Sequence, residues 1–315
     1  MLDVRRLRLL SDLHRLGTIA AVADARSYTA SAVSQQLTAL ERETGVALLE
    51  RTGRRVTLTA AGQVLVRHTE TVLAALEEAG ASLAAVRSGP AGPVRIGAFP
   101  SVMRTLLPPV LVTLGHDHPA LELTVTELDP ALVPAALRER RLDVGLTSDY
   151  DIAPAEPDPS LDSVPLLRET VYLAEPASTA TGSVAGVAST PWILATPGTL
   201  CHEAILRVCR DAEFIPRARH HADDFATVLA LVAAGQGVSL VPELAATTPP
   251  AGVRLTALPV SRRTSIGFRR GAAAHPAVAA VIAALRQRRA TGASADPGDP
   301  GRSADPARGP MHRQG

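Results

Sequence analysis

Residues 27–45 read SYTASAVSQQLTALERETG and combine an aliphatic stripe with a stripe of small hydroxyl and amide side chains. Val33, Leu37 and Leu40 recur at helical spacing and would form one face of a helix. The opposite face offers uncharged donors and acceptors with one guanidinium, which are groups that hydrogen-bond to the edges of nucleic-acid bases. An ordinary amphipathic surface helix is the alternative, although such a helix would normally carry more charge. The polar set comprises Thr29, Ser31, Ser34, Gln35, Gln36, Thr38 and Arg42.

The segments around this helix favour the base-reading interpretation. A hydroxyl at Thr29 can cap the helix, and Gly45 can end it in a left-handed conformation. Upstream, residues 4–16 predict an amphipathic helix, and residues 18–26 predict a short helix followed by a turn. Three short helices with a tight turn between the last two form a helix-turn-helix, here over about residues 19–38, whose last helix lies in the DNA major groove.

The stretch LLERTGRRVTLTAAG, residues 48–62, predicts the two short strands of a wing with a tight turn at Gly53. The wing carries three guanidinium groups, on Arg51, Arg54 and Arg55. Guanidinium groups around a tight turn suit phosphates or a narrow minor groove. A solvated surface hairpin is the alternative, and the neighbouring polar stripe argues for the DNA contact.

A long helix is predicted after this winged helix-turn-helix domain, residues 1–60. It covers residues 61–89, begins after a Thr59 cap and ends at the SGPAGP sequence. Its apolar residues alternate spacings of four and three over three repeats, which is a heptad seam and favours pairing with a second copy of the same helix. Packing within the chain is the alternative. The predicted dimerisation residues are Leu65, Val72, Leu76, Leu83 and Val86, and Thr69 and Ala79 complete the seam.

Residues 92–289 alternate predicted strands and helices and therefore indicate parallel β-sheets in an α/β domain. We expect two lobes joined by crossing strands. Lobe 1 would comprise about residues 92–162 and 266–289, and lobe 2 about residues 163–265. The tail, residues 290–315, is rich in Pro, Gly, Ala and Asp, a composition typical of disordered segments.

The chain resembles the LysR-type transcriptional regulators, which have a winged helix-turn-helix, a linker helix and a two-lobed effector domain like a periplasmic binding protein. The resemblance covers about residues 5–288. The recognition helix departs from the usual Ser-Gln-Pro opening, because Thr29, Ala30 and Ser31 stand there, and Gln35 replaces a commonly basic residue. The matching segments are LRLLSDLHRLGTIAAVADA, ASAVSQQLTALERETGVALLERTGRRVTLTAAG, PVRIGAFPSVMRTLLPPVL, LRERRLDVGL and LVAAGQGVSLVPEL.

The resemblance implies a sequence-specific regulator of transcription whose operator binding or promoter activation responds to a small molecule. The implied partners are double-stranded operator DNA, a small-molecule effector and further copies of the chain in a homodimer or homotetramer, and the resemblance also allows contact with RNA polymerase. The alternative is a ligand-binding or transport-type α/β protein with a helical oligomerisation segment and no DNA role. The polar stripe and the wing arginines argue against that alternative.

Several predicted strand ends carry polar residues that could bind this small molecule. In open α/β sheets, ligands bind beyond the carboxyl ends of the strands. Ser101 combines a hydroxyl with a predicted helix N-terminus, so it is the expected main anchor of a small, anionic effector. Thr147 in the same lobe and Thr196 in the other would let the effector bridge the lobes, although capping and turn formation are alternative roles. The predicted effector-binding set is Phe99, Ser101, Thr147, Thr196, Gly198 and Asp224.

Motifs and composition argue against catalysis, metal binding and membrane insertion. The sequence has no P-loop, GxSxG, HExxH or CxxC motif, and the adjacent His220 and His221 would point to opposite faces of a strand. No apolar run approaches the ~20 residues of a membrane span, and no signal peptide is recognisable. The net charge of +1 disfavours a general polyanion binder, although residues 1–60 hold nine Arg against six Asp and Glu. We therefore expect a cytoplasmic, nucleoid-associated protein that is not an enzyme and needs no cofactor.

The two cysteines, Cys201 and Cys209, are predicted to lie on one helix, about 12 Å apart along its axis. That separation excludes a disulfide between them without unfolding. A position in the first helical turn could lower the thiol pKa of Cys201 and make it a redox sensor. A small half-buried apolar side chain is the favoured interpretation, because no resolving cysteine lies nearby.

We predict that replacing Gln35 or Thr38 with Ala relaxes discrimination at one base position per operator half-site, because both side chains lie on the polar stripe. A base contact of this kind contributes about 1–3 kcal/mol. Fluorescence anisotropy with operator and scrambled DNA measures the change. Variants that discriminate between the two DNAs as the wild type does would show that the stripe does not read bases.

Overall fold

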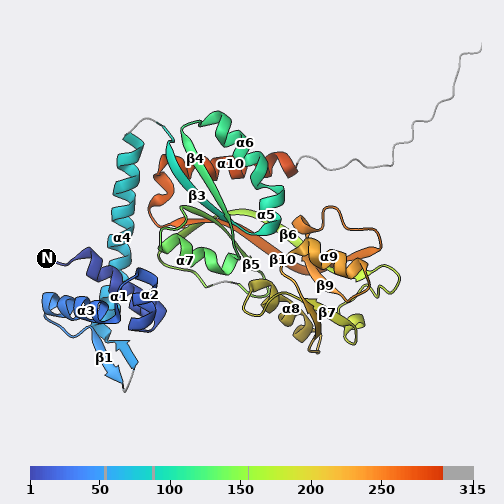
Figure 1. The fold of residues 1–315 in the computed structure, drawn as a ribbon, viewed down its shortest axis with the longest axis horizontal. Coiled ribbons are helices and arrows are strands. Elements are labelled where there is room, and N and C mark those ends of the chain that lie inside the picture. Colours follow the sequence, from blue (N-terminus) through green and yellow to red (C-terminus); the bar gives the residue numbers. More distant parts are fainter. Residues whose placement is uncertain (53–54, 87–88, 155, 294–315) are drawn as a thin grey trace, which may run out of the picture.

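The computed structural model describes residues 1–52, 55–86, 89–154 and 156–293 of the 315-residue chain. A helical N-terminal body with a two-stranded wing is joined by one long helix to a larger α/β body (Figure 1). No helix within these residues is both long and apolar enough to cross a membrane. The predicted order of a winged helix-turn-helix, a linker helix and an α/β domain is therefore confirmed.

The N-terminal body is built from three capped helices. In each, the side chain of the preceding residue accepts a hydrogen bond from a backbone N–H of the first turn. In the third helix the Thr29 hydroxyl accepts from the N–H of Ala32 at 3.1 Å, and Gly45 ends the helix with a φ of 70°. The apolar stripe of this helix is buried against the other two, as its periodicity predicts. The helices are α1 (Val4–Leu16), α2 (Ile19–Arg26) and α3 (Ala30–Thr44).

The wing consists of the antiparallel strands β1 (Leu49–Thr52) and β2 (Arg55–Leu58). Glu41 on α3 fixes its start, because one carboxylate oxygen accepts hydrogen bonds from the backbone N–H groups of Leu48 and Leu49 at 2.9 and 3.0 Å. The wing is thus held in a defined position beside α3.

The linker helix α4 (Ala60–Val86) connects the two bodies, and its predicted Thr59 cap is confirmed. Its first half packs into the core of the winged helix domain. Its second half is bonded to the α/β body through Glu77, whose carboxylate accepts a hydrogen bond from Arg269 Nε at 2.9 Å and a second one from Arg140. One carboxylate therefore joins the linker to two segments of the α/β body.

The α/β body contains a six-stranded mixed sheet with the strand order β4–β3–β5–β10–β6–β9. β3 runs parallel to β4 and β5, but β10 runs antiparallel to β5 and β6, so the expectation of purely parallel sheets is wrong. The long strands β6 and β10 pass through both lobes, and the lobe boundaries expected near residues 162 and 265 fall inside them. The parallel strands β7 and β8 form a small sheet in lobe 2. The bounds are β3 (Gly92–Ala98), β4 (Leu121–Glu127), β5 (Val144–Tyr150), β6 (Leu161–Pro176), β7 (Pro191–Leu194), β8 (Arg217–His221), β9 (Ser239–Pro242) and β10 (Val253–Arg269).

The helix predicted to begin at Ser101 differs from the prediction. Its N-cap is Phe99, two residues before the predicted cap Ser101, and the helix is split in two at Leu106. Pro108 and Pro109 explain the break, because a proline ring clashes with the carbonyl four residues earlier and has no N–H to donate. The last helix extends into the tail that was predicted to be disordered, and the residues beyond it lie outside the described ones. The helices are α5 (Pro100–Thr105), α6 (Leu107–Asp117), α7 (Val133–Arg138), α8 (Leu200–Asp211), α9 (Phe225–Ala233) and α10 (Pro276–Ala293), with 3-10 turns η1 (Pro130–Leu132), η2 (Ala185–Val187), η3 (Glu243–Ala245) and η4 (Ala272–Ala274).

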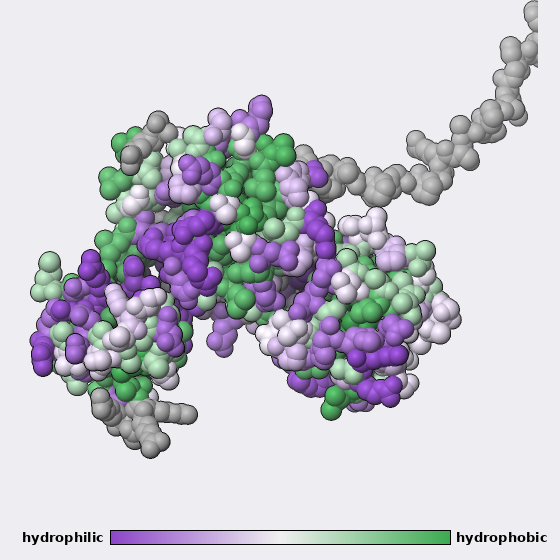
Figure 2. Space-filling view, in the orientation of Figure 1, coloured by the Kyte–Doolittle hydropathy of each residue, from purple (hydrophilic) through white to green (hydrophobic). Residues whose placement is uncertain are grey.

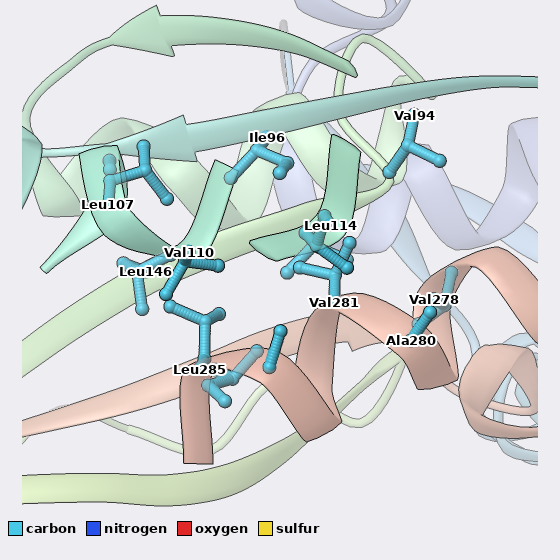
Figure 3. Packing of buried hydrophobic residues seen from close by; sticks show 14 of the residues in the cluster. Val94, Ile96, Leu107, Val110, Leu114, Leu146, Val278, Ala280, Val281 and Leu285 are labelled. Carbon is cyan, nitrogen blue, oxygen red and sulfur yellow. The ribbon is translucent and has the colours of Figure 1, made fainter. Parts of the chain in front are cut away.

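The largest hydrophobic core lies where α6 and α10 cover the sheet of lobe 1. Figure 3 shows Leu114 of α6 beside Val281 of α10, below Ile96 of β3. All three side chains are almost completely buried. A second core surrounds Trp192 in lobe 2. Each lobe therefore has its own core, and the crossing strands connect the two.

We predict that Gly271→Ala loosens the contact between α4 and the α/β body. Gly271 has a φ of 88°, and a Cβ at this position would lie 2.4 Å from the carbonyl oxygen of Ala74 on α4. The backbone strain alone costs about 1–2 kcal/mol, and the clash adds to it. Hydrogen exchange over residues 74–78 should rise.

Gly252→Ala is the matched control for this substitution. Gly252 has a φ of 85°, but a Cβ there would meet no atom within 4 Å. It therefore reproduces the strain without the clash. Equal exchange over residues 74–78 in the two variants would contradict a role of Gly271 in the contact with α4.

Candidate functional site

The exposed face of α3 carries the predicted polar set, but its members differ in their partners. The Thr29 hydroxyl is occupied by capping, Ser34 is half-buried, and Gln36 accepts a hydrogen bond from Arg6 Nε at 3.0 Å. The other side chains are exposed and make no hydrogen bond or ion pair with any described residue; they are Ser31, Gln35, Thr38 and Arg42. This second group is available to a partner outside the chain.

Two of the three wing arginines lie in the strands of the wing. The backbones of Arg51 and Arg55 lie in β1 and β2, in register with Val56 and Thr52. Arg54 lies outside the described residues, and the side chains of the other two arginines are not described. Their predicted contact with DNA stays a prediction.

The predicted seam of α4 divides into two parts. Leu65 is half-buried against the core of its own winged helix domain, and Thr69 is only 1% exposed, so neither presents its side chain fully to a partner helix. Further along, apolar side chains are 40–85% exposed, and Figure 2 shows hydrophobic residues at the surface along this helix. These exposed residues are Val72, Leu76, Leu83 and Val86. The second half of α4 therefore presents an apolar surface that the described part of the chain does not cover.

A cavity of about 300 Å³ lies between the two lobes. Both lobes and the crossing strand β10 contribute to its lining. Phe99, Ser101 and Thr196 line it as predicted. The cavity is at the lower end of the sizes typical of small-molecule sites, and aromatic, aliphatic and polar side chains all reach it.

Two of the residues that were predicted to line the cavity do not line it, and in each case the adjacent residue in the sequence does. Thr147 points to the other face of β5 and donates a hydrogen bond to the carbonyl of Ser265 at 3.4 Å, whereas Ser148 lines the cavity. Asp224 caps α9 and forms an ion pair with Arg104 at 2.7 Å, whereas Asp223 lines the cavity. In both segments the residue that lines the cavity is therefore one position before or after the predicted one: Ser148 on β5, and Asp223 in the turn between β8 and α9.

Gly198 also does not line the cavity. It lies in the turn before α8 with a φ of 90°, and no atom lies within 4 Å of where its Cβ would be. Its role is conformational, because few residues other than glycine adopt this φ without strain.

Ser101 lines the cavity but is only 2% exposed, and its hydroxyl accepts a hydrogen bond from Arg262 Nη2 at 3.1 Å. The guanidinium of Arg262 lies over the Phe99 ring at 4.8 Å and is also 3.0 Å from the carboxylate of Glu169. Ser101 therefore positions a charged side chain of the cavity wall. The role of principal anchor, expected from the sequence, does not fit this arrangement.

Arg262 and Glu169 were not among the residues predicted from the sequence to form the site. They stand opposite each other on β10 and β6, and both are at most 5% exposed. The available signal was strand alternation, because Thr264, Ile266 and Phe268 share the inward face of β10 with Arg262. An arginine at an inward position of a strand needs a buried partner.

Cys201 lines the cavity next to Tyr150, and its thiol is not activated. Burial raises the pKa of Cys201 to about 11, although a hydrogen bond with Tyr150 acts in the opposite direction. Burial likewise raises the pKa of Cys209 to about 12, and that side chain is fully inaccessible. The structure therefore favours the small half-buried side chain over the redox sensor.

A helix with an exposed polar face beside a wing, a linker helix with an exposed apolar surface and a two-lobed domain with a central cavity are the parts of a ligand-responsive DNA-binding regulator. Residues 4–63 match the family described as "Bacterial regulatory helix-turn-helix protein, lysR family", and residues 87–290 match the "LysR substrate binding domain". The chain belongs to the LysR family of DNA-binding transcriptional regulators. Members of this family are regulators and not enzymes.

Related proteins and structures agree with this assignment. The chain is 27% identical to the transcriptional dual regulator GltC of Bacillus subtilis over 81% of this chain and 86% of that protein. It is 31% identical to a probable hydrogen peroxide-inducible genes activator of Streptomyces viridosporus over 90% of this chain and 96% of that protein. The fold is shared with a hydrogen peroxide-bound OxyR mutant of Corynebacterium glutamicum, with a TM-score of 0.57 and 23% identity over 93% of this chain and 94% of that chain. It is also shared with full-length BenM, with a TM-score of 0.54 and 21% identity over 93% of this chain and 98% of that chain.

We predict that Cys201 reacts slowly with iodoacetamide at neutral pH, because only the thiolate attacks and about one thiol in ten thousand is ionised four pH units below the pKa. The rate should rise about tenfold per pH unit towards pH 10. Mass spectrometry of the alkylated peptide measures it, with glutathione as the reference thiol. A Cys201 that reacts faster than glutathione at neutral pH would contradict the raised pKa and reopen the sensor interpretation.

Proposed function

We propose that α3 enters the major groove of operator DNA and reads bases with Ser31, Gln35, Thr38 and Arg42. The observation that carries this proposal is that these side chains are exposed on one helix face and have no partner among the described residues. Short polar side chains and arginine are the groups that read base edges. The wing arginines would contact the phosphates beside the site.

The exposed apolar surface of α4 supports self-association of the chain in this function. Two copies of α4 packed through Val72, Leu76, Leu83 and Val86 would place two α3 helices on a two-fold operator. A homodimer is the minimal unit and a homotetramer its extension. Contact with RNA polymerase at the promoter and a cytoplasmic, nucleoid-associated location belong to the same proposal.

The cavity between the lobes is the proposed effector site. It lies at the crossing strands, so a ligand that contacts both lobes favours one lobe arrangement over others. β10 carries Arg262 at the cavity and Arg269 at the contact with Glu77 of α4. A change in lobe angle would therefore reach the linker helix through one strand.

Fluorescence anisotropy with DNA fragments from beside the protein's own gene tests the proposed function. Wild-type protein should bind one fragment tightly and scrambled DNA weakly. Equal affinity for all fragments, with no effect of Gln35→Ala, would contradict sequence-specific reading by α3.

We predict that Leu76→Asp breaks the dimer and reduces operator affinity, because the new carboxylate would meet its own copy across the two-fold axis and burying like charges is costly. Analytical ultracentrifugation measures the assembly state. Ile215→Asp is the control, because Ile215 is an exposed apolar residue of lobe 2, far along the chain from α4. A Leu76→Asp protein that is still dimeric would show that α4 does not form the interface.

A further inference from the structure

The cavity between the lobes has an acidic lining. Among the described residues that line it, the carboxyl and guanidinium side chains belong to Glu127, Asp129, Asp223 and Arg262. Arg262 is balanced by the buried carboxylate of Glu169 at 3.0 Å. The three other carboxylates therefore set the charge of the cavity. This charge is opposite to the one that the expected anionic effector would need.

Asp129 and Asp223 reach the cavity from opposite lobes. Asp129 follows β4 and accepts a hydrogen bond from the N–H of Ala131 at 2.8 Å. Asp223 follows β8 and accepts from the N–H and the hydroxyl of Thr196 at 2.7 and 2.8 Å. These neutral donors hold both carboxylates in place without cancelling their charge, and neither carboxylate forms an ion pair with a described residue.

The two carboxylates also influence each other. Burial and, to a smaller extent, the charge of Asp223 raise the pKa of Asp129. The negative charges of the two side chains, which reach the cavity from opposite lobes, therefore repel each other. A positive group placed between them would turn this repulsion into two attractive contacts.

Ser148 provides a separate indication that the cavity takes a polar ligand. It lines the cavity from β5, the residue is only 7% exposed, and its hydroxyl makes no hydrogen bond with any described residue. The hydroxyl still reaches solvent at the cavity wall, because it is not one of the fully buried polar atoms without a partner. A ligand with a hydrogen-bond donor or acceptor at this point would therefore find a free partner.

Apolar side chains from both lobes also line the cavity and can pack against a ligand. Phe99 and Leu128 come from lobe 1, and Leu200 and Phe225 come from lobe 2. A hydrocarbon group of a ligand that packs against these side chains is removed from water. This removal favours binding roughly in proportion to the apolar area that is buried. The site thus combines an acidic centre with apolar walls.

Resting on the proposed role of this cavity as the effector site, we propose that the effector is a small organic cation: a protonated amine on a short hydrocarbon skeleton. The ammonium group lies between Asp129 and Asp223 and donates to both, and the skeleton packs on the apolar walls. By bridging two carboxylates that repel each other, the ligand stabilises the arrangement in which both lobes contact it.

An anionic effector fits the site less well. It would need Arg262, whose Nη2 already donates to Glu169 and Ser101, whereas its buried Nε has no hydrogen-bond partner among the described residues. The charge of the guanidinium is balanced by Glu169, and the carboxylates of Asp129 and Asp223 would repel an anion. The acidic pair is therefore the recognition element of the proposal.

Isothermal titration calorimetry on the full-length protein tests the proposal. The probes are butylamine, 1,4-diaminobutane and phenethylamine, each compared with a carboxylate of similar skeleton: butyrate, succinate and 3-phenylpropionate. At least one amine should bind and the carboxylates should not. Asp129→Asn and Asp223→Asn should each weaken the binding at least tenfold. Glu122→Gln, an exposed carboxylate on β4 outside the cavity, is the matched control and should leave it unchanged.

Three results would overturn the proposal: no amine binding at millimolar concentration, amine affinity unchanged in both Asn variants, or carboxylate binding that is lost in Arg262→Met. Operator binding is measured separately by anisotropy without ligand. Amine binding by a protein that binds no operator would refute the proposed function and support this inference. Operator binding by a protein that binds no amine would support the proposed function and refute this inference.

Discussion

The ion pair between Arg262 and Glu169 is the interaction on which the α/β body depends. The two residues face each other on the crossing strands, where both side chains are almost fully buried. Removing two charges from water costs several kcal/mol per ion, and mutual attraction offsets this only with good geometry and further hydrogen bonds. The hydroxyl of Ser101 and the N–H of Leu244 provide such bonds, so the pair ties β6 and β10 to α5 and η3.

The same strand connects the cavity to the DNA-binding half of the chain. β10 runs from Arg262 at the cavity to Arg269, which bonds to Glu77 on the linker helix. Burial alone would raise the pKa of Glu77, but the hydrogen bonds and charges of Arg269 and Arg140 outweigh it and lower the pKa. The carboxylate therefore stays charged at neutral pH. The contact between linker and α/β body is a charged one next to the close backbone approach at Gly271.

Local sequence signals were sufficient for the winged helix domain and the linker helix. The Thr29 cap, the Gly45 terminus and the apolar stripe of α3 are properties of neighbouring residues, and all three are present in the structure. The same signals identified the polar face that stands exposed. They failed where two local rules competed, as at Pro108, which splits a helix that periodicity alone would continue.

Long-range packing decided the composition of the cavity. On β5, a shift of one residue moves a side chain to the opposite face, so Ser148 and not Thr147 lines the cavity. In the turn after β8, Asp224 caps α9 and the preceding Asp223 lines the cavity. Strand alternation places Arg262 at an inward position, but its pairing with Glu169 could not be foreseen because that residue lies on another strand, 93 residues away in the sequence. The sign of the cavity's charge depends on which charged groups meet across the lobes and which neutralise each other, and only the folded chain brings them together.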